Sequence, residues 1–386
     1  MKIAFFSWES LHSIPVGGLA VHITELAAAM NRAGHDVHVF TRLGHGQPHY
    51  SNIDGVHYHR CPFDLNPNFV TEMNNMGRSF VHHLFGVEKA IGSFDIVHGH
   101  DWHVVNALAD VKNYAHKKVF WTCHSTEYGR SGNQFHGGLS ENIRNIEFYG
   151  TYISNKVVAC SNSMKDEVKW LYRVPDWKLE VINNGISADK YRGELDDPGV
   201  IKRKYQLGPI DPTVLFVGRM THQKGPDLLL ESMPTVLRQN PQARTVFVGD
   251  GYMKRQLEHR AHQLGVSYAT RFTGYSSEDD VLDLYKACET VCVPSRNEPF
   301  GLVVLEAMAS GKPVIATHGG GPGEIIDHEV TGVKVYPNPS SIAWGINYVF
   351  SDHDRAKTMG SNGKKMASTK FSWDRIASET IDIYNE

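Results

Sequence analysis

Short apolar runs of the kind that form β-strands alternate with helical stretches along the chain, and this series occurs twice. In the first half the runs cover residues 2–8, 36–41, 95–98, 118–123 and 157–160. Residues 19–32 have apolar side chains at helical spacing, and Gly34 follows them as a typical helix end. Strands that alternate with helices favour β-α-β units and a mostly parallel sheet.

A second series of runs covers residues 213–218, 245–249, 271–273, 290–294, 313–317 and 332–336. Residues 187–212 are polar and charged and contain proline, so they predict the connection between two domains. The sequence therefore predicts an α/β protein with two Rossmann-like, doubly wound domains, 1–190 and 205–370, that face each other across a cleft. Ligands of such sheets bind beyond the carboxyl ends of the strands.

Composition excludes several classes of protein. The 386 residues include 39 lysines and arginines and 42 acidic residues, which gives a formal net charge of −3. This balance argues against nucleic-acid binding and gives no support for docking on anionic lipid by charge. No apolar stretch has the length of a transmembrane helix, and the five cysteines are scattered without a CxxC pair. We therefore expect a cytoplasmic protein without a disulfide framework or a zinc ribbon.

The first half has candidate site residues at a helix start and after one strand. Gly17 and Gly18 precede the helix at 19–32, where free N–H groups suit a phosphate or a sugar hydroxyl; a simple tight turn is the alternative. The stretch 98–103 reads His-Gly-His-Asp-Trp-His and contains the residue types of a metal site. A turn after a strand would spread those ligands apart. We therefore favour a polar, aromatic rim of the cleft over a metal site.

Two further candidates lie later in this half. His124 follows the strand at 118–123 and could donate a hydrogen bond to a sugar hydroxyl, with a structural histidine as the alternative. Asn184 and Gly185 lie in a turn whose backbone could contact a ligand.

The second half carries a pair of cations. Arg219 follows the strand at 213–218, and Lys224 lies five residues further on, before a helix predicted at 226–236. The planar fork of an arginine and the point charge of a lysine together suit a diphosphate. A solvated surface pair is the alternative, and the spacing is not that of a Walker A loop.

The most informative stretch follows the strand at 290–294. Glu298 lies in the turn, where it can bind a polar ligand, and the N–H groups of residues 300–303 open a helix that favours an anion. Glu306 follows on an otherwise apolar helix. A carboxylate there is costly to bury without a partner, and a ribose diol would supply one.

With these motifs the chain resembles retaining glycosyltransferases of the GT-B fold, specifically family 4, over nearly its whole length. Glu298 and Glu306, separated by seven residues, match the paired-glutamate motif of that family. The other matches occur in the order the family has: Gly17-Gly18, His124, Asn184-Gly185, Gly218-Arg219 and Lys224. Phe371-Ser372-Trp373 resembles the segment from which the terminal helix, about 371–386, packs back on the first domain.

A second likeness is to glycogen and starch synthases. The stretch 98–102 resembles their HxHDW motif, and 17–20 resembles the end of their KTGGLAD motif. Two departures count against membership of that group: Pro15 stands where those enzymes have lysine, and Val21-His22 replaces their Asp-Val. The resemblance therefore implies a family 4 enzyme with a synthase-like acceptor region.

The resemblance implies transfer of a hexose, with glucose favoured, from a nucleotide sugar to a carbohydrate or small-molecule acceptor, with retention and with attack on the leaving-group face. UDP-glucose or ADP-glucose is the favoured donor, and no metal or other cofactor is expected. The implied catalytic residues are His124, Arg219, Lys224, Glu298 and Asp101. The implied donor-binding residues are Gly17, Gly18, Asn184, Gly218, Arg219, Lys224, Glu298, Phe300, Gly301, Leu302, Val303 and Glu306. The implied acceptor-binding residues are His100, Asp101 and Trp102.

Within that set Arg219 and Lys224 would bind the donor diphosphate, and Glu306 would hold the ribose. Glu298 and His124 would bind sugar hydroxyls, and Asp101 would orient or deprotonate the acceptor. Alternatives stay open: an α-glucan synthase, a non-hydrolysing nucleotide-sugar epimerase of the same fold, and a binding module without activity. Membrane association also stays open, because family 4 includes enzymes with lipid acceptors, and the sequence indicates no oligomeric state.

Overall fold

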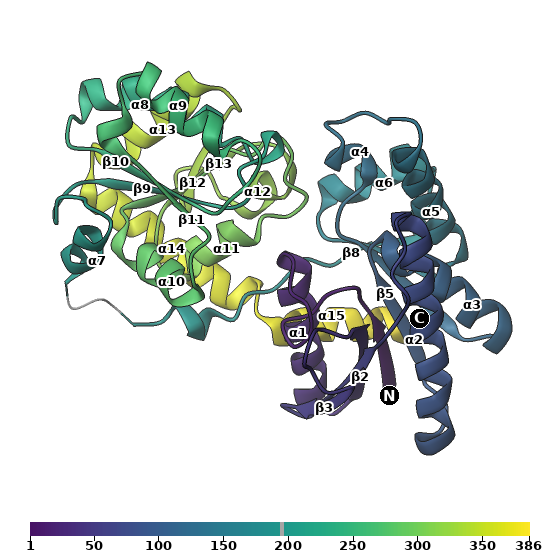
Figure 1. Ribbon diagram of the computed structural model, residues 1–386. Helices are drawn as coiled ribbons and strands as arrows, with labels where there is room; N and C mark the ends of the chain where they lie inside the picture. Colours follow the sequence, from purple (N-terminus) through teal and green to yellow (C-terminus); the bar gives the residue numbers. More distant parts are fainter. Residues whose placement is uncertain (194–196) are drawn as a thin grey trace. The chain divides into compact units, whose positions relative to one another are not determined.

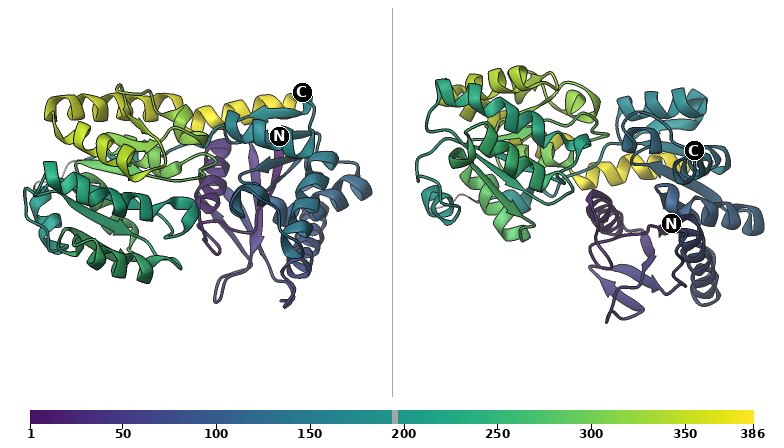
Figure 2. Two further views of the ribbon diagram at one scale, coloured as in Figure 1. Left: turned by 90° about the horizontal axis from the view of Figure 1, so that it is seen from above. Right: turned by 45° about the horizontal axis from the view of Figure 1, so that its top comes forward.

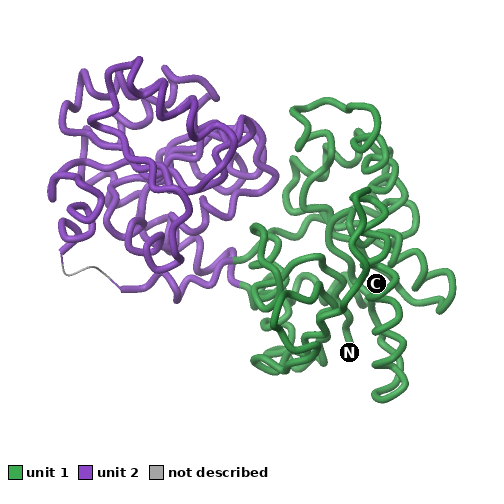
Figure 3. The backbone as a smooth tube through the Cα atoms, viewed as in Figure 1, with its two compact units in different colours: residues 1–185, 373–386 green, residues 186–372 purple. Residues whose placement is uncertain are grey.

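The structure is a computed structural model that describes residues 1–193 and 197–386. These residues form two compact units, which Figure 3 distinguishes by colour. Unit 1 contains Met1–Gly185 and Trp373–Glu386, and unit 2 contains Ile186–Ser372. The end of the chain therefore belongs to the same unit as its start. Among the described helices, none combines the length and the apolar character that crossing a membrane requires.

Unit 1 is built on a sheet of eight described strands in the order β3-β4-β2-β1-β5-β6-β7-β8 (Figure 1). The strands are β1 (Lys2–Phe6), β2 (Asp36–Arg42), β3 (Tyr50–Ile53), β4 (Val56–Cys61), β5 (Ile96–His100), β6 (Lys118–Cys123), β7 (Lys156–Ala159) and β8 (Leu179–Val181). All neighbours pair in parallel except β3 and β4, which form an antiparallel hairpin. Asp54 and Gly55 make its turn with φ of 51° and 83°, as a two-residue hairpin loop requires.

The helices of unit 1 cover its sheet. They are α1 (Gly18–Arg32), α2 (Phe69–Ile91), α3 (Val105–Ala115), α4 (Glu127–Arg130), α5 (Leu139–Ile153), α6 (Asn162–Tyr172) and α15 (Trp373–Asn385), with short 3-10 turns η1 (Trp102–Val104) and η2 (Asp176–Lys178). The central strand β1 is buried on both faces, and Ile3, Ala4, Phe5 and Phe6 have no exposed surface. A parallel strand covered by helices on both faces reads as such a continuous apolar run.

The last helix, α15, lies against α1 at the C-terminal end of the chain (Figure 2). Its buried face adds Trp373, Ile376 and Tyr384 to the apolar core that contains β1. The Tyr384 hydroxyl lies 2.5 Å from His98 Nδ1, and His98 Nε2 lies 2.7 Å from the Thr122 hydroxyl. His98 is thus a hydrogen-bonded core histidine that connects α15 to the sheet.

Unit 2 has a parallel sheet of six described strands in the order β11-β10-β9-β12-β13-β14. The strands are β9 (Thr213–Val217), β10 (Arg244–Val248), β11 (Thr270–Gly274), β12 (Thr290–Val293), β13 (Val314–Thr317) and β14 (Gly332–Val335). The helices are α7 (Pro198–Lys204), α8 (Pro226–Gln239), α9 (Lys254–Gln263), α10 (Glu278–Ala287), α11 (Leu302–Ala309), α12 (Gly320–Ile325), α13 (Pro339–Phe350) and α14 (His353–Lys370). The 3-10 turns are η3 (Ala188–Tyr191), η4 (His222–Lys224) and η5 (Ser267–Ala269). Figure 1 shows α8, α9 and α13 on one face of this sheet and α10, α11 and α14 on the other, a doubly wound arrangement.

The structure corrects three expectations. Residues 187–212 are not a plain connection, because their described part belongs to unit 2 and contains η3 and α7; residues 194–196 lie outside the description. Buried Lys202 on α7 explains the difference, since its Nζ pairs with Glu289 Oε1 at 2.7 Å and fixes this segment to the unit. After β13, residues Gly320–Ile325 form the short helix α12, which was not predicted. Strands β3, β4 and β8 were not predicted, because β3 and β4 are polar and histidine-rich and β8 has three residues.

The contact between Gly185 and Trp373 predicts a stability effect within unit 1. A Cβ atom at Gly185 would lie 2.5 Å from Trp373 Cδ2, and the indole is almost fully buried. We expect Gly185→Ala to lower the free energy of unfolding by about 1–3 kcal/mol, the usual cost of overpacking. Urea unfolding followed by circular dichroism measures the change.

Gly86 supplies the matched control. It lies inside α2, and a Cβ atom there would meet nothing within 4 Å. Gly86→Ala should therefore raise the free energy of unfolding, by up to about 1 kcal/mol from helix propensity. Equal unfolding midpoints for the Gly185 variant and the unchanged protein would contradict the packing described here.

Candidate active site

The charged residues predicted in unit 2 follow two neighbouring strands, β9 and β12. Lys224 and Glu298 form an ion pair with Nζ 2.7 Å from Oε2, and their side chains are 23% and 11% exposed. The Ser295 hydroxyl donates a second hydrogen bond to the same carboxylate oxygen at 3.1 Å. Because a lysine ammonium has three donors, the pair leaves Lys224 able to bind an anion as well.

Arg219 differs from its neighbour Arg296 in its partners. Arg296 donates to both carboxylate oxygens of Asp227, at 2.8 and 2.5 Å, and is held in place. Arg219 is exposed, and its guanidinium has no hydrogen-bond or ion-pair partner within the part of the chain that the structure describes. It directly follows Gly218, which has φ of 153° at the end of β9. An unpaired guanidinium with five donors is a ready partner for an anion.

The helix expected near Phe300 begins two residues later, as α11 at Leu302. Phe300 is 4% exposed and packs into the unit, and Gly301 adopts φ of 101° before the helix. The first N–H groups of α11, which include those of Leu302 and Val303, have no partner inside the helix. Such groups can bind an anion, and the anion site expected at residues 300–303 stays a prediction.

Glu306, in the second turn of α11, already has a protein partner. The Tyr285 hydroxyl on α10 donates to Glu306 Oε2 at 2.7 Å. Burial raises the pKa of the Glu306 carboxyl, and the Lys190 ammonium opposes the shift. The tyrosine was not predicted, because no local sequence signal connects α10 to α11. The Tyr285 hydroxyl occupies one carboxylate oxygen of Glu306 and leaves the other oxygen able to accept a hydrogen bond from a ligand hydroxyl.

In unit 1, Asp101 follows β5 with φ of 60° and ψ of 174°, a strained backbone conformation that residues other than glycine rarely adopt. Its carboxylate accepts from the His124 backbone N–H at 3.0 Å, and its carbonyl accepts from Trp121 Nε1 at 3.0 Å. Burial raises the pKa of Asp101 to about 6, although the charge of Arg130 acts against it. A carboxylate held this way titrates close to the range where a general base works.

Three imidazoles lie beside Asp101: His22 from α1, His100 from the end of β5, and His124 after β6. His100 Nδ1 lies 3.1 Å from His124 Nε2, and the His22 ring contacts both. Among the described residues, neither ring nitrogen of His22 has a hydrogen-bond partner, and His100 Nε2 has none. Burial lowers the pKa of all three, that of His124 to about 3, so the rings are neutral at pH 7.

Asn184 is buried beside His22, and its side-chain oxygen likewise lacks a partner in the described structure. The structure therefore gathers His100, Asp101, His124 and Asn184 within unit 1. Trp102 takes a different place, because its ring is 4% exposed and packs on His103 and Phe69.

Gly17 and Gly18 lie exposed at the start of α1, as predicted, but the Gly17 N–H is not free. Glu9 Oε2 accepts hydrogen bonds from the N–H groups of Val16 and Gly17, at 2.5 and 2.8 Å. Glu9 is 3% exposed, and burial raises its pKa. A glutamate eight residues before the glycines gave no sequence signal.

Sequence reasoning also missed the network behind Asp101. Arg130 donates to Glu147 Oε1 at 2.6 Å and to Glu127 Oε2 at 3.2 Å, and the Tyr172 hydroxyl donates to Glu147. Glu147 has no exposed surface. These residues come from α4, α5 and α6, so only the fold brings them together. The network fixes the loop after β6 that carries His124.

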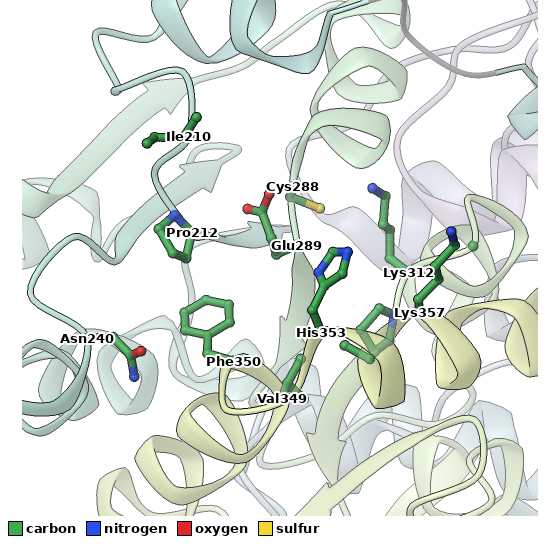
Figure 4. Close-up of a pocket in the computed structure, with 13 residues that line it drawn as sticks. Ile210, Pro212, Asn240, Cys288, Glu289, Lys312, Val349, Phe350, His353 and Lys357 are labelled. Atoms are coloured by element: carbon green, nitrogen blue, oxygen red, sulfur yellow. The ribbon is translucent and has the colours of Figure 1, made fainter.

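A separate cavity of about 550 Å³ lies at the opposite edge of the unit 2 sheet (Figure 4). Pro212, Glu289 and Pro313 line it, and each precedes one of the strands β9, β12 and β13. The cavity is therefore at the amino ends of the strands, while Arg219, Lys224 and Glu298 follow the carboxyl ends.

Both halves of the chain match family models of glycosyltransferases. The family model for "Glycosyltransferase Family 4" matches residues 16–190, and the model for "Glycosyl transferases group 1" matches residues 200–366. An uncharacterized glycosyltransferase of Methanocaldococcus jannaschii is 40% identical, over 100% of this chain and 98% of that protein. A glycogen synthase of Mycobacterium tuberculosis is 29% identical, over 100% of this chain and 94% of that protein.

Solved structures share the fold. Sucrose-phosphate synthase from Thermosynechococcus elongatus superimposes with a TM-score of 0.82 at 23% identity, covering 100% of this chain and 98% of that one. The Anabaena protein HepE in complex with UDP-glucose gives a TM-score of 0.78 at 21% identity, covering 99% of both chains. Both family models, the relative at 40% identity and the two parallel-sheet units lead to one conclusion: the chain is a glycosyltransferase of family 4 with the GT-B fold.

Proposed function

We propose that this glycosyltransferase moves a hexose, glucose, from a nucleoside diphosphate sugar to an acceptor hydroxyl with retention of configuration. The observation that carries the proposal is the charge arrangement of unit 2. The unpaired guanidinium of Arg219 and the ion-paired ammonium of Lys224 follow the same strand, β9. A nucleoside diphosphate is the ligand class that this pair of cations suits best.

In this proposal Arg219 and Lys224 bind the diphosphate and stabilise the charge that develops on it as the bond to the sugar breaks. Fixed cations aimed at developing charge are usually the largest single contribution to catalysis. The N–H groups at the start of α11 act in the same direction, with Gly218 and residues 300–303 forming the backbone that surrounds the phosphates. Because these groups supply positive charge, the proposed reaction needs no divalent metal.

The remaining residues hold the rest of the donor. Glu306 has one carboxylate oxygen outside its bond to Tyr285, and we assign it to the ribose. Glu298, held by Lys224 and Ser295, and the neutral ring of His124 are assigned to hydroxyls of the sugar. Gly17, Gly18 and Asn184 are assigned to the donor from unit 1. UDP-glucose and ADP-glucose are the first donors to test, and the HepE structure with UDP-glucose supports that choice.

Asp101 is assigned to the acceptor as the group that orients its hydroxyl and accepts its proton. We assign His100 and Trp102, on either side of Asp101, to the same acceptor site, and both side chains are buried in this structure. A polymeric α-glucan is the acceptor that one observation favours, the 29% identity to a glycogen synthase over the whole chain. We propose a cytoplasmic setting, in keeping with five buried cysteines that are all free thiols.

Release of nucleoside diphosphate tests the donor assignment. With UDP-glucose or ADP-glucose in EDTA, Arg219→Ala should lower kcat by about 10²–10³-fold, the loss typical of removing one group that stabilises developing charge. Arg255→Ala removes another exposed arginine of unit 2 and is the matched control. Its kcat should equal that of the unchanged protein. Equal losses in both variants, or release that requires a divalent ion, would contradict the assignment.

Titration of Asp101 predicts the acidic limb of the pH profile. Burial raises the pKa of this carboxyl to about 6, so it loses its charge as pH falls through 6, and a protonated carboxyl cannot accept the proton of the acceptor. We expect kcat/KM to fall below pH 6. The low residual activity of Asp101→Asn should lack this limb, and an unchanged limb in that variant would exclude the proposed role.

With one donor held constant, the acceptor assignment predicts that different acceptors stimulate nucleotide release to different extents. If the acceptor is an α-glucan, glycogen or a maltooligosaccharide should stimulate nucleotide release and itself gain labelled glucose. Stimulation by monosaccharides or a polyprenyl phosphate, with none by glucan, would leave the transferase assignment intact and overturn the glucan assignment.

A further inference from the structure

A second group of ionisable side chains lies in unit 1 at the amino ends of β2 and β4. Asp36 and His38 are on β2, and His57 is on β4. The parallel register pairs His38 directly with His57. Asp36 Oδ1 lies 3.1 Å from His38 Nε2 and 3.7 Å from His57 Nε2. Three potential ligand atoms of two chemical types therefore converge on one point.

The other ring nitrogen of each histidine already has a protein partner. His38 Nδ1 lies 2.9 Å from His59 Nε2, and His57 Nδ1 lies 2.8 Å from the Tyr50 hydroxyl. The two rings stack with centroids 4.4 Å apart and planes 12° apart. The candidate ligand atoms of Asp36, His38 and His57 all lie within 4.8 Å of one another, and binding of one ion by both Nε2 atoms requires one ring to turn out of the stack. Histidines that bind metals almost always bond their second nitrogen to a protein group in this way, which fixes the tautomer and the ring orientation.

Burial and charge also suit a cation. The side chain of His38 is 4% exposed, whereas those of His57 and Asp36 are 31% and 41% exposed, so the point of convergence is open to solvent on one side. A histidine binds a metal through an unprotonated ring nitrogen, and a carboxylate binds it as the anion.

We propose that Asp36 Oδ1, His38 Nε2 and His57 Nε2 form a binding site for a divalent transition metal, with Zn²⁺ as the best fit. Zinc bonds of about 2.0–2.1 Å in tetrahedral geometry place ligand atoms about 3.3 Å apart, which lies between the two observed separations. Water completes the coordination from the exposed side. Two nitrogens and one carboxylate favour zinc over Mg²⁺ or Ca²⁺, which take oxygen ligands.

The proposed site is separate from the transfer reaction. It lies at the amino ends of the strands in unit 1, and His100, Asp101 and His124 lie at or after their carboxyl ends. The metal would join β2 to β4, which also carries the edge strand β3. Its role is therefore structural, and the absence of a metal requirement in transfer would not contradict it. Without a metal, the same residues form a hydrogen-bonded Asp-His cluster. Titration with zinc distinguishes the metal-bound site from that cluster.

Zinc titration of the full chain tests the site. Protein freed of metal with a chelator, then exchanged into buffer, is titrated with Zn²⁺ against a chromophoric chelator, and its Tm is measured with and without zinc. We expect one tightly bound equivalent and a higher Tm with zinc. His57→Ala and Asp36→Asn should lose that equivalent. His45 is an exposed histidine on the loop after β2, and His45→Ala should keep the equivalent.

Two further variants keep the result interpretable. Tyr50→Phe leaves all three ligands in place and should weaken zinc binding by about 10–100-fold. An unchanged Tm of the metal-free variant would show that the weaker binding does not come from a loss of folding. His22→Ala tests the other imidazole group, whose ligand atoms also lie within 4.8 Å of one another. The proposal is wrong if the unchanged protein binds no zinc, or if the bound equivalent survives His57→Ala and disappears in His22→Ala.

Discussion

Close approach of backbone segments at the carboxyl edge of the unit 2 sheet determines where its charged residues lie. Gly225, with φ of 66°, lies so near the end of β12 that a Cβ atom would be 2.2 Å from the Pro294 carbonyl oxygen. Gly320, with φ of 65°, approaches the Glu298 carbonyl in the same way, at 2.4 Å. Only glycine fits these positions. Because the loops after three strands touch here, Lys224 reaches Glu298 although 74 residues separate them.

Unit 1 positions its polar groups by burial instead. Asp101 is held by backbone N–H groups and by the nearby charge of Arg130, which also pairs with the fully buried Glu147. Removing one member of such a network leaves an unpaired buried charge, which is strongly destabilising. The same low-dielectric surroundings keep His22, His100 and His124 neutral. Burial likewise lowers the pKa of His38 on β2 and of His59 on β4.

The sequence predicted the parallel sheets well, because buried parallel strands read as continuous apolar runs with polar residues after them. It therefore placed Arg219, Lys224, Glu298 and Glu306 after the correct strands. It could not predict Tyr285 beside Glu306 or Glu9 beside Gly17, since those contacts join segments with no shared local pattern. The histidine-rich strand β4 was missed because alternate imidazoles read as polar, although they pack in stacks against β2.

We propose that this chain transfers glucose with retention, by fixed cations of its own. NMR of a donor labelled with ¹³C at the anomeric carbon, incubated with glycogen and EDTA, tests this directly. We expect the donor signal to disappear and an α-glycosidic signal to grow at an equal rate. Formation of a β-linked product, or free glucose as the only labelled product, would contradict retaining transfer to the glucan.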